Sequence, residues 1–215
     1  MNGFTGKTYW LVGASEGLGR ALAHQLSAQG AHLVLSARNV ERLDSLNAEI
    51  PGSRVLPLDV TNGQAVQRAA SEIGELHGVI YNVGTYEPMH TAKWHTDAAL
   101  AMTDVNFSGA LRLLGEVVPR FVNNGKGDIT LIGSLAGYRG LPAAIGYGAS
   151  KAALISLAET MRFDLRGSGV NVRLVNPGFV ETRLTQKNSF RMPMLMSPED
   201  AAERVLKAMT KKRFR

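Results

Sequence analysis

The sequence predicts an α/β protein, a three-layer doubly wound parallel sheet of about six strands, folded as a single domain over residues 1–215. Short apolar runs alternate along the chain with amphipathic stretches, and no repeat, linker or low-complexity segment interrupts them. The apolar runs are nearly continuous, which is typical of strands covered on both faces of a parallel sheet. Strands joined by right-handed helical crossovers then give the doubly wound arrangement.

The apolar runs predict strands at 8–13, 31–37, 54–58, 78–83, 128–133 and 170–175. The stretches between them predict helices near 17–29, 39–50, 62–73, 96–121, 144–167 and 198–210. In such a sheet, ligands bind beyond the carboxyl ends of the strands. We therefore expect the functional residues in the loops that follow the strands.

Composition excludes several classes of protein. The chain is 45% hydrophobic, which argues against disorder, and no apolar run approaches the ~18 residues of a membrane helix. The first residues lack a secretion signal, so we expect a cytoplasmic protein. With no cysteine there is no thiolate chemistry, and the five histidines lack metal-ligand spacing, so no metal is expected. The net charge of +6 is partly concentrated in the terminal KKRFR, which we interpret as a solvated helix end, and no nucleic-acid partner is expected.

The loop after the first strand reads GASEGLG, with glycines at Gly13, Gly17 and Gly19. Glycines allow a tight turn and let backbone N–H groups approach a phosphate closely. The helix that begins near Gly17 directs its positive end at the same place. A glycine-rich turn without a ligand is the alternative. Its position after the first strand favours a dinucleotide site, which would also include Ser15, Glu16 and Leu18.

The second strand ends in LSARN, without the acid that binds ribose hydroxyls in NAD-dependent folds. Arg38 stands there instead, between Ala37 and Asn39, and a guanidinium binds phosphate through charge-assisted hydrogen bonds. The alternative is an ordinary arginine in the first turn of a helix. The pattern favours NADP(H) over NAD(H).

The third and fourth strands end in DVT and YNVG. Asp59 can accept a hydrogen bond from an adenine amino group, with Val60 against the ring, or Asp59 and Thr61 can cap the next helix. Asn82, Val83 and Gly84 bring backbone close to the middle of the cofactor.

The reacting end is expected after the fifth and sixth strands. Ser134 lies at a strand edge, and Tyr147 and Lys151 lie one helical turn apart on one face. A free tyrosine, with a pKa of about 10, is a poor acid–base catalyst near neutrality. A neighbouring ammonium stabilises the phenolate and lowers that pKa. Ser134 could hold the substrate oxygen beside the phenol.

Taken together, the order and spacing of these motifs resemble the classical branch of the short-chain dehydrogenase/reductase family, which has a Rossmann fold. The resemblance covers essentially the whole chain. The matching residues are Gly13, Gly17, Gly19, Asp59, the NVG at 82–84, Asn106 in VNFSG, Ser134, Tyr147, Lys151 and NPGFVET at 176–182.

The resemblance implies a role for each residue of the reacting end. Tyr147 is the general acid in reduction and the base in oxidation, and Lys151 lowers its pKa and holds the nicotinamide ribose. Ser134 orients the substrate carbonyl. Asn106 shapes the central helix and holds a water that links Lys151 to solvent. Near the nicotinamide, the resemblance places Pro177, Gly178, Val180 and Thr182.

The sequence thus predicts an NADP(H)-dependent oxidoreductase that interconverts a carbonyl and an alcohol of a small molecule. The alternative is a catalytically silent NADP(H)-binding regulatory or scaffold protein. The substrate pocket is expected from 84–95, 135–143 and 183–197, with methionines in FRMPMLM as an apolar lid, as ordinary packing or as a partner surface. The resemblance also implies a homodimer or homotetramer, formed through the long helices.

Three departures from the family pattern stand out. Val12 replaces the usual threonine before the first glycine, so the tie that holds this turn is in question. Tyr81 and Val83 replace asparagine and alanine, which predicts altered crowding on the adenine side. The given sequence ends at Arg215, soon after the last predicted helix, whereas family members usually continue into a seventh strand and a tail, so we expect either a shortened chain or an unusually open pocket.

Overall fold

The computed structural model describes residues 3–211 and 214 and shows one parallel six-stranded sheet in the order β3-β2-β1-β4-β5-β6. The strand order reverses between β1 and β4, which places the crevice of a doubly wound fold beyond their carboxyl ends. The predicted fold class is confirmed. The strands are β1 Thr8–Val12, β2 His32–Ser36, β3 Arg54–Val55, β4 Gly78–Tyr81, β5 Gly127–Ile132 and β6 Val170–Val175.

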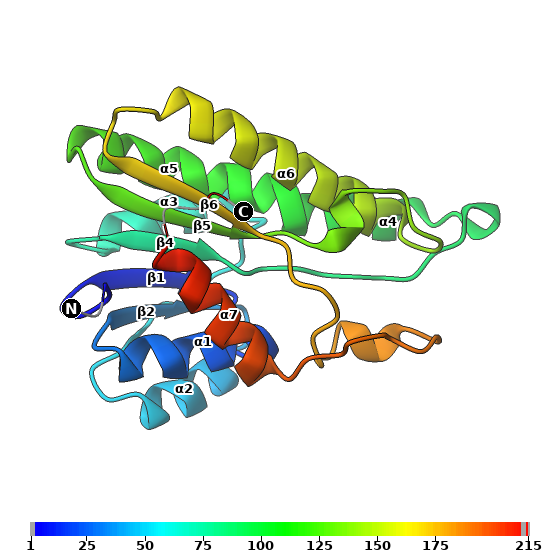
Figure 1. Cartoon of the computed structure of the whole chain (residues 1–215), viewed down its shortest axis with the longest axis horizontal. Helices are drawn as coiled ribbons and strands as arrows, with labels where there is room; N and C mark the ends of the chain where they lie inside the picture. The colour runs from blue at the N-terminus through cyan, green and yellow to red at the C-terminus, as the bar shows by residue number, and fades with distance from the viewer. Residues whose placement is uncertain (1–2, 212–213, 215) are drawn as a thin grey trace.

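Helices cover both faces of the sheet (Figure 1). One face carries α3, α5 and α6, and the other carries α1, α2 and α7. Their bounds are α1 Gly17–Ala28, α2 Val40–Glu49, α3 Gly63–Glu72, α4 Thr96–Thr103, α5 Gly109–Asn123, α6 Ile145–Asp164 and α7 Pro198–Met209. Shorter turns are η1 Thr91–Lys93, the π-helical η2 Asp104–Ser108, η3 Leu135–Gly137 and η4 Thr185–Lys187.

The sheet has a hydrophobic core on each of its two faces, which explains why the strands are continuous apolar runs in the sequence. Neighbouring residues of β1 point to opposite faces, so Trp10 packs under α3 and α5 while Leu11 packs under α1 and α7. Both side chains are completely buried. Each strand position must therefore be apolar whichever face it meets.

The third strand is shorter than the predicted 54–58. Only Arg54 and Val55 form regular pairs with β2, although Leu56 and Leu58 still donate backbone hydrogen bonds to the β2 side. Pro57 lies between them and has no N–H to donate, which interrupts the ladder.

The helix expected at 96–121 is divided by the π-turn η2 into α4 and α5. A π-turn widens the helix by one residue per turn, and such turns are frequent at functional sites. Buried Asn106 lies inside it. Sequence periodicity does not register this insertion, so the prediction of one regular helix was wrong in its middle.

The C-terminal KKRFR is only partly described, because 212, 213 and 215 lie outside the described residues. Phe214 is nevertheless buried against the α6 face, its carbonyl accepts a hydrogen bond from Leu174 N in β6 at 2.8 Å, and Arg162 stacks on its ring. The interpretation as a solvated helix end was wrong for Phe214, which lies along β6 where a further strand would pair. Among the described helices, none is long and apolar enough to cross a membrane.

Candidate functional site: a dinucleotide-type cleft with a Ser-Tyr-Lys end

A pocket of about 600 Å³ opens at the carboxyl ends of the strands, where the strand order reverses. Its wall includes nearly every residue predicted for the cofactor and the reacting end. Gly19 and Asn106 are the exceptions, because they lie behind the wall and support it. The predicted residues that line it are Gly13, Ser15, Glu16, Gly17, Leu18, Ala37, Arg38, Asn39, Asp59, Val60, Asn82, Val83, Gly84, Ser134, Tyr147, Lys151, Pro177, Gly178, Val180 and Thr182.

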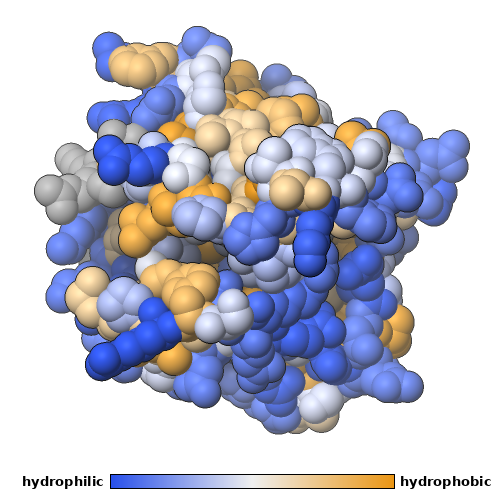
Figure 2. All heavy atoms as spheres, turned by 90° about the vertical axis from the view of Figure 1, so that its right-hand side faces the viewer, coloured by the Kyte–Doolittle hydropathy of each residue, from blue (hydrophilic) through white to orange (hydrophobic). Residues whose placement is uncertain are grey.

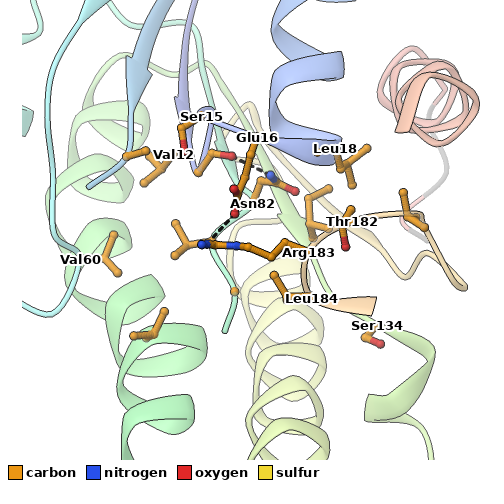
Figure 3. A pocket seen from close by; sticks show the side chains of 18 of the residues that line it. Val12, Ser15, Glu16, Leu18, Val60, Asn82, Ser134, Thr182, Arg183 and Leu184 are labelled. Carbon is orange, nitrogen blue, oxygen red and sulfur yellow. Dashed lines mark hydrogen bonds and ion pairs between the residues drawn. The ribbon is translucent and has the colours of Figure 1, made fainter. Parts of the chain in front are cut away.

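The glycine turn is held by its neighbours on both sides. The N–H groups of Gly13 and Ala14 donate to Ser36 O of β2 at 2.8 and 3.1 Å. Asn82 Nδ2 donates to Gly13 O at 2.9 Å, as Figure 3 shows. These bonds anchor the turn without a threonine hydroxyl at Val12, so the first departure is compensated by backbone and by Asn82.

Glycine is required at two positions of this turn. Gly13 has φ +91°, and a Cβ there would lie 2.8 Å from the Asn82 carbonyl carbon. At Gly19 a Cβ would collide with the Gly13 carbonyl oxygen. The turn and the first turn of α1 can approach each other only with these side chains absent, which leaves the N-terminus of α1 open to a phosphate.

The end of the pocket that the sequence assigns to adenine carries Arg38 and Asp59. Burial would raise the pKa of Asp59, but hydrogen bonds from Thr61 and the charges of Arg38 and Arg112 outweigh it and hold that pKa below its usual range. Asp59 is therefore an ionised acceptor facing the pocket. The alternative that it caps α3 was wrong, since Asn62 accepts from Ala65 N at the start of that helix.

Lys151 lies at the opposite end, fully buried, and donates to Ile132 O at 2.9 Å. Its Nζ lies 5.8 Å from the centroid of the Tyr147 ring. Burial lowers the pKa of Lys151 from 10.5 to about 8. The ammonium and the phenol thus share one wall, as the one-turn spacing predicted.

The pKa of Tyr147 is raised, whereas the sequence predicted that it would be lowered. Burial raises it, the hydrogen bond with Ser134 lowers it part of the way back, and Tyr86 raises it further. The expected net lowering by Lys151 is not seen in this structure, because desolvation of the phenolate dominates. Ser134 is held by Ala136 N, which donates to its hydroxyl at 3.1 Å.

Asn106 lies behind the reacting end, and both the oxygen and the nitrogen of its side-chain amide form hydrogen bonds. Its Oδ1 accepts from Thr85 N at 2.7 Å, and its Nδ2 donates to Thr85 O and to Ser150 Oγ, both at 3.0 Å. Ser150 in turn donates to Tyr147 O at 2.8 Å. The π-turn therefore connects the loop after β4 to the first turns of α6.

The second departure has a structural counterpart. Tyr81 is fully buried, and its hydroxyl donates to Val105 O in η2 at 2.5 Å. A Cβ at Gly109 would lie 2.6 Å from that hydroxyl, so the glycine makes room for the tyrosine. The same added Cβ would lie 2.7 Å from Cγ2 of Val60, so Tyr81 packs near the residue predicted against the adenine ring.

Several lining residues were missed. Arg42 of α2 and Val105 of η2 line the pocket without having been predicted, whereas Arg183 and Leu184 belong to the predicted substrate segment 183–197. Tyr86 packs edge-on against Tyr147 at 5.1 Å between ring centroids. Tyr86 lies in the predicted loop 84–95 and Arg183 in the predicted segment 183–197, although neither was singled out, whereas nothing local in the sequence marks Arg42. No group of described side chains has the composition of a metal site.

The fold and the pocket are of the doubly wound, dinucleotide-binding type, and comparison with known proteins gives the family. The short chain dehydrogenase family matches residues 7–192, and the chain belongs to that family of oxidoreductases.

Relatives and solved structures agree with this assignment. An uncharacterized oxidoreductase of Myxococcus xanthus is 37% identical, covering 92% of this chain and 81% of its own. Sulfoacetaldehyde reductase of Chromohalobacter salexigens is 34% identical, covering 82% and 73%. A short chain dehydrogenase of Burkholderia cenocepacia in complex with NADP has a TM-score of 0.89 at 27% identity, covering 98% and 86%. One of Sphingobium yanoikuyae in complex with NADPH has a TM-score of 0.90 at 27% identity, covering 97% and 86%.

Proposed function

We propose that this protein is an NADP(H)-dependent oxidoreductase that interconverts a ketone or aldehyde and an alcohol. The observation that carries the proposal is the convergence of Ser134, Tyr147 and Lys151 at one end of a pocket whose other end carries Arg38. Two similar structures were solved with NADP and NADPH, which supports the choice of cofactor.

The residues fit such a dinucleotide. The absence of side chains at Gly13 and Gly19 leaves room at the N-terminus of α1 for the pyrophosphate. Arg38 suits the 2′-phosphate, and Asp59 suits the adenine amino group. Lys151 faces the pocket beside Tyr147, where it would hold the nicotinamide ribose.

The chain's own residues would handle the proton. When bound, the reduced nicotinamide supplies a hydride to the carbonyl carbon. The Tyr147 phenol donates its proton to the carbonyl oxygen, and the Ser134 hydroxyl donates a hydrogen bond to the same oxygen. The Lys151 ammonium stabilises the phenolate that remains, which is most needed because burial raises the pKa of Tyr147.

An apolar or aromatic carbonyl compound is the proposed substrate. Apolar side chains gather on the upper and left part of the face in Figure 2, which is the side of the molecule where the loops around the pocket mouth lie in Figure 1. Tyr86 and Leu184 flank the reacting end. Exposed hydrophobic residues of the predicted substrate loops are Trp94, Leu135, Tyr138, Leu141, Phe190, Met194 and Leu195. Met194 is 89% exposed, which fits a lid better than packing.

We place the protein in the cytoplasm, where NADP(H) is available.

The test is turnover by Tyr147→Phe. The wild-type protein should consume NADPH with members of a panel of ketones and aldehydes. The variant should lose about 10²–10⁴-fold in kcat, which is the usual contribution of a positioned acid, and should still quench or enhance NADPH fluorescence on binding. NADPH binding without turnover of any panel member, unaffected by Tyr147→Phe, would favour the regulatory protein instead.

The cofactor preference is tested at Arg38. Because its guanidinium would pair with the 2′-phosphate, Arg38→Ala should weaken NADPH binding at least about tenfold and leave NADH binding nearly unchanged. Fluorescence titration with both cofactors measures the two dissociation constants. A wild-type protein that binds NADH as tightly as NADPH, or a variant that keeps the preference, would contradict the assignment of Arg38.

A further inference from the structure

One guanidinium in the pocket wall is explained neither by the glycine motif nor by the reacting end. Arg183 Nη2 lies 2.7 Å from Oε1 of Glu16 in the glycine turn. Figure 3 shows the Arg183 side chain reaching across the pocket to Glu16. The other Glu16 oxygen pairs with Arg42 of α2. One carboxylate therefore joins the glycine turn, α2 and the segment that follows β6.

The side chain of Thr182, just before Arg183, lies directly against the start of α1. A Cβ at Gly17 would lie 2.9 Å from Thr182 Cγ2, so the two segments are in contact. Thr185 fixes this turn, since its hydroxyl accepts from Thr182 N at 3.0 Å and donates to Val180 O at 2.7 Å. The start of α1 is where a pyrophosphate binds in such folds, so Arg183 is held beside that position.

The same segment is tied to the opposite wall of the pocket. Lys187 Nζ lies 2.6 Å from Glu87 Oε2 and donates to Tyr86 O at 2.8 Å. Residues 182–187 thus run from the glycine turn to the loop after β4, with an ion pair at each end. A molecule bound in the pocket beside this segment can leave more easily when one of the two ion pairs opens.

We propose that Arg183 and Glu16 form a clasp over the pyrophosphate of the bound dinucleotide, and that opening of this clasp limits dissociation. The inference rests on the dinucleotide binding proposed above. Arg183 is largely exposed, and an exposed ion pair contributes little to folding. A guanidinium beside a phosphate makes strong charge-assisted hydrogen bonds, so the effect of the clasp is on ligand release.

The clasp is tested by measuring the dissociation rate constants of NADPH and NADH. Each bound cofactor is displaced in a stopped-flow experiment and followed by its fluorescence, in wild type, Arg183→Gln, Glu16→Gln and the double variant. Each single substitution should raise the dissociation rate constant about tenfold, equivalent to about 1.4 kcal/mol. The double variant should be no faster than the faster single variant, because one interaction is lost once. NADH should respond as NADPH does, since both contain the pyrophosphate.

Arg68→Gln is the matched control, because it removes the same charge from an exposed position of α3 outside the pocket wall, and it should leave both rate constants unchanged. Additive effects of the two substitutions, unchanged rate constants, or an effect confined to NADPH would overturn the clasp. If wild type binds neither cofactor, the proposed function fails and the clasp with it. If it binds both and the variants release them at the wild-type rate, only the clasp fails.

Discussion

At the scale of single residues, the site is built around a buried charge. Lys151 is the one lysine among the buried polar and charged residues of the described chain, and its partner in the structure is the carbonyl of Ile132. A carbonyl offers a dipole and no opposite charge, so desolvation is only partly offset and the pKa falls to about 8. The residue expected to tune Tyr147 is therefore itself tuned by burial.

This burial predicts a pH-dependent contribution to stability. The folded-state pKa of about 8 lies below the ordinary value of 10.5, so between them the unfolded chain binds more protons and stability rises with pH. The full cost of the buried charge is about 3 kcal/mol, present below pH 8 and lost as pH rises towards 10.5. Relative to Lys151→Met, wild type should gain about 2 kcal/mol between about pH 7 and about pH 9.5.

Urea unfolding of both proteins at the two pH values measures the difference. Tyrosines such as Tyr9 and Tyr81 also respond to alkaline pH, but they are common to both proteins and cancel. Exposed Lys207→Met is the control and should show no such trend. A difference for Lys151→Met that stays constant with pH would contradict the lowered pKa.

At the scale of elements, the glycine turn depends on contacts between segments far apart in the sequence. Gly13 meets the backbone of Asn82 at the end of β4, and Gly17 meets Thr182 after β6. The turn is therefore shaped by β4 and by the segment after β6 as much as by its own residues. The same holds for η2, whose Val105 carbonyl is bonded by Tyr81 of β4.

Gly19→Ala should disturb this turn. The added methyl group would collide with the Gly13 carbonyl oxygen, so either α1 or the turn must move. We expect a loss of about 1–3 kcal/mol in the free energy of unfolding and a large loss of NADPH affinity, measured by urea denaturation and fluorescence titration.

Gly115→Ala is the control for that substitution. Gly115 is exposed in α5 and a Cβ there meets no atom within 4 Å, so alanine should stabilise the helix by about 0.5–1 kcal/mol. An equal response of the two glycine variants would show that helix propensity, not the close approach to Gly13, determines the outcome at Gly19.

At the scale of the whole molecule, the two helical layers differ in what they expose. The α4, α5 and α6 side presents Leu100, Leu111 and Phe163 to solvent, and Phe163 is 63% exposed. These helices are the ones through which the family resemblance implies association. We propose a homodimer or homotetramer formed through this side.

Sedimentation tests this association. Wild type should sediment as a dimer or tetramer, and Leu111→Glu should raise the dissociation constant at least about tenfold, because a charge would be buried at the contact. Val40→Glu, at an exposed apolar position of α2 in the other layer, should leave the assembly unchanged. A wild-type protein that is monomeric at every concentration would contradict the proposal.

The six strands, the alternation of helices and most of the pocket wall could be predicted from the sequence. This is possible because apolar periodicity, Gly13 and Gly17, and the spacing of Tyr147 and Lys151 are local properties of the chain. Most residues that the sequence placed near the cofactor follow strand ends, which meet at one edge of any parallel sheet, while Tyr147 and Lys151 come from a helix.

The π-turn around Asn106, the burial of Phe214 and the raised pKa of Tyr147 followed from tertiary packing alone. It also brought Arg183 and Arg42 to opposite oxygens of Glu16. Each of these depends on desolvation or on contacts between segments distant in sequence, and neither leaves a periodic signal in the chain. The order of the residues along the chain is enough to place the reactive side chains at one edge of the sheet. Packing alone determines their pKa values and the ion pairs that connect the walls of the pocket.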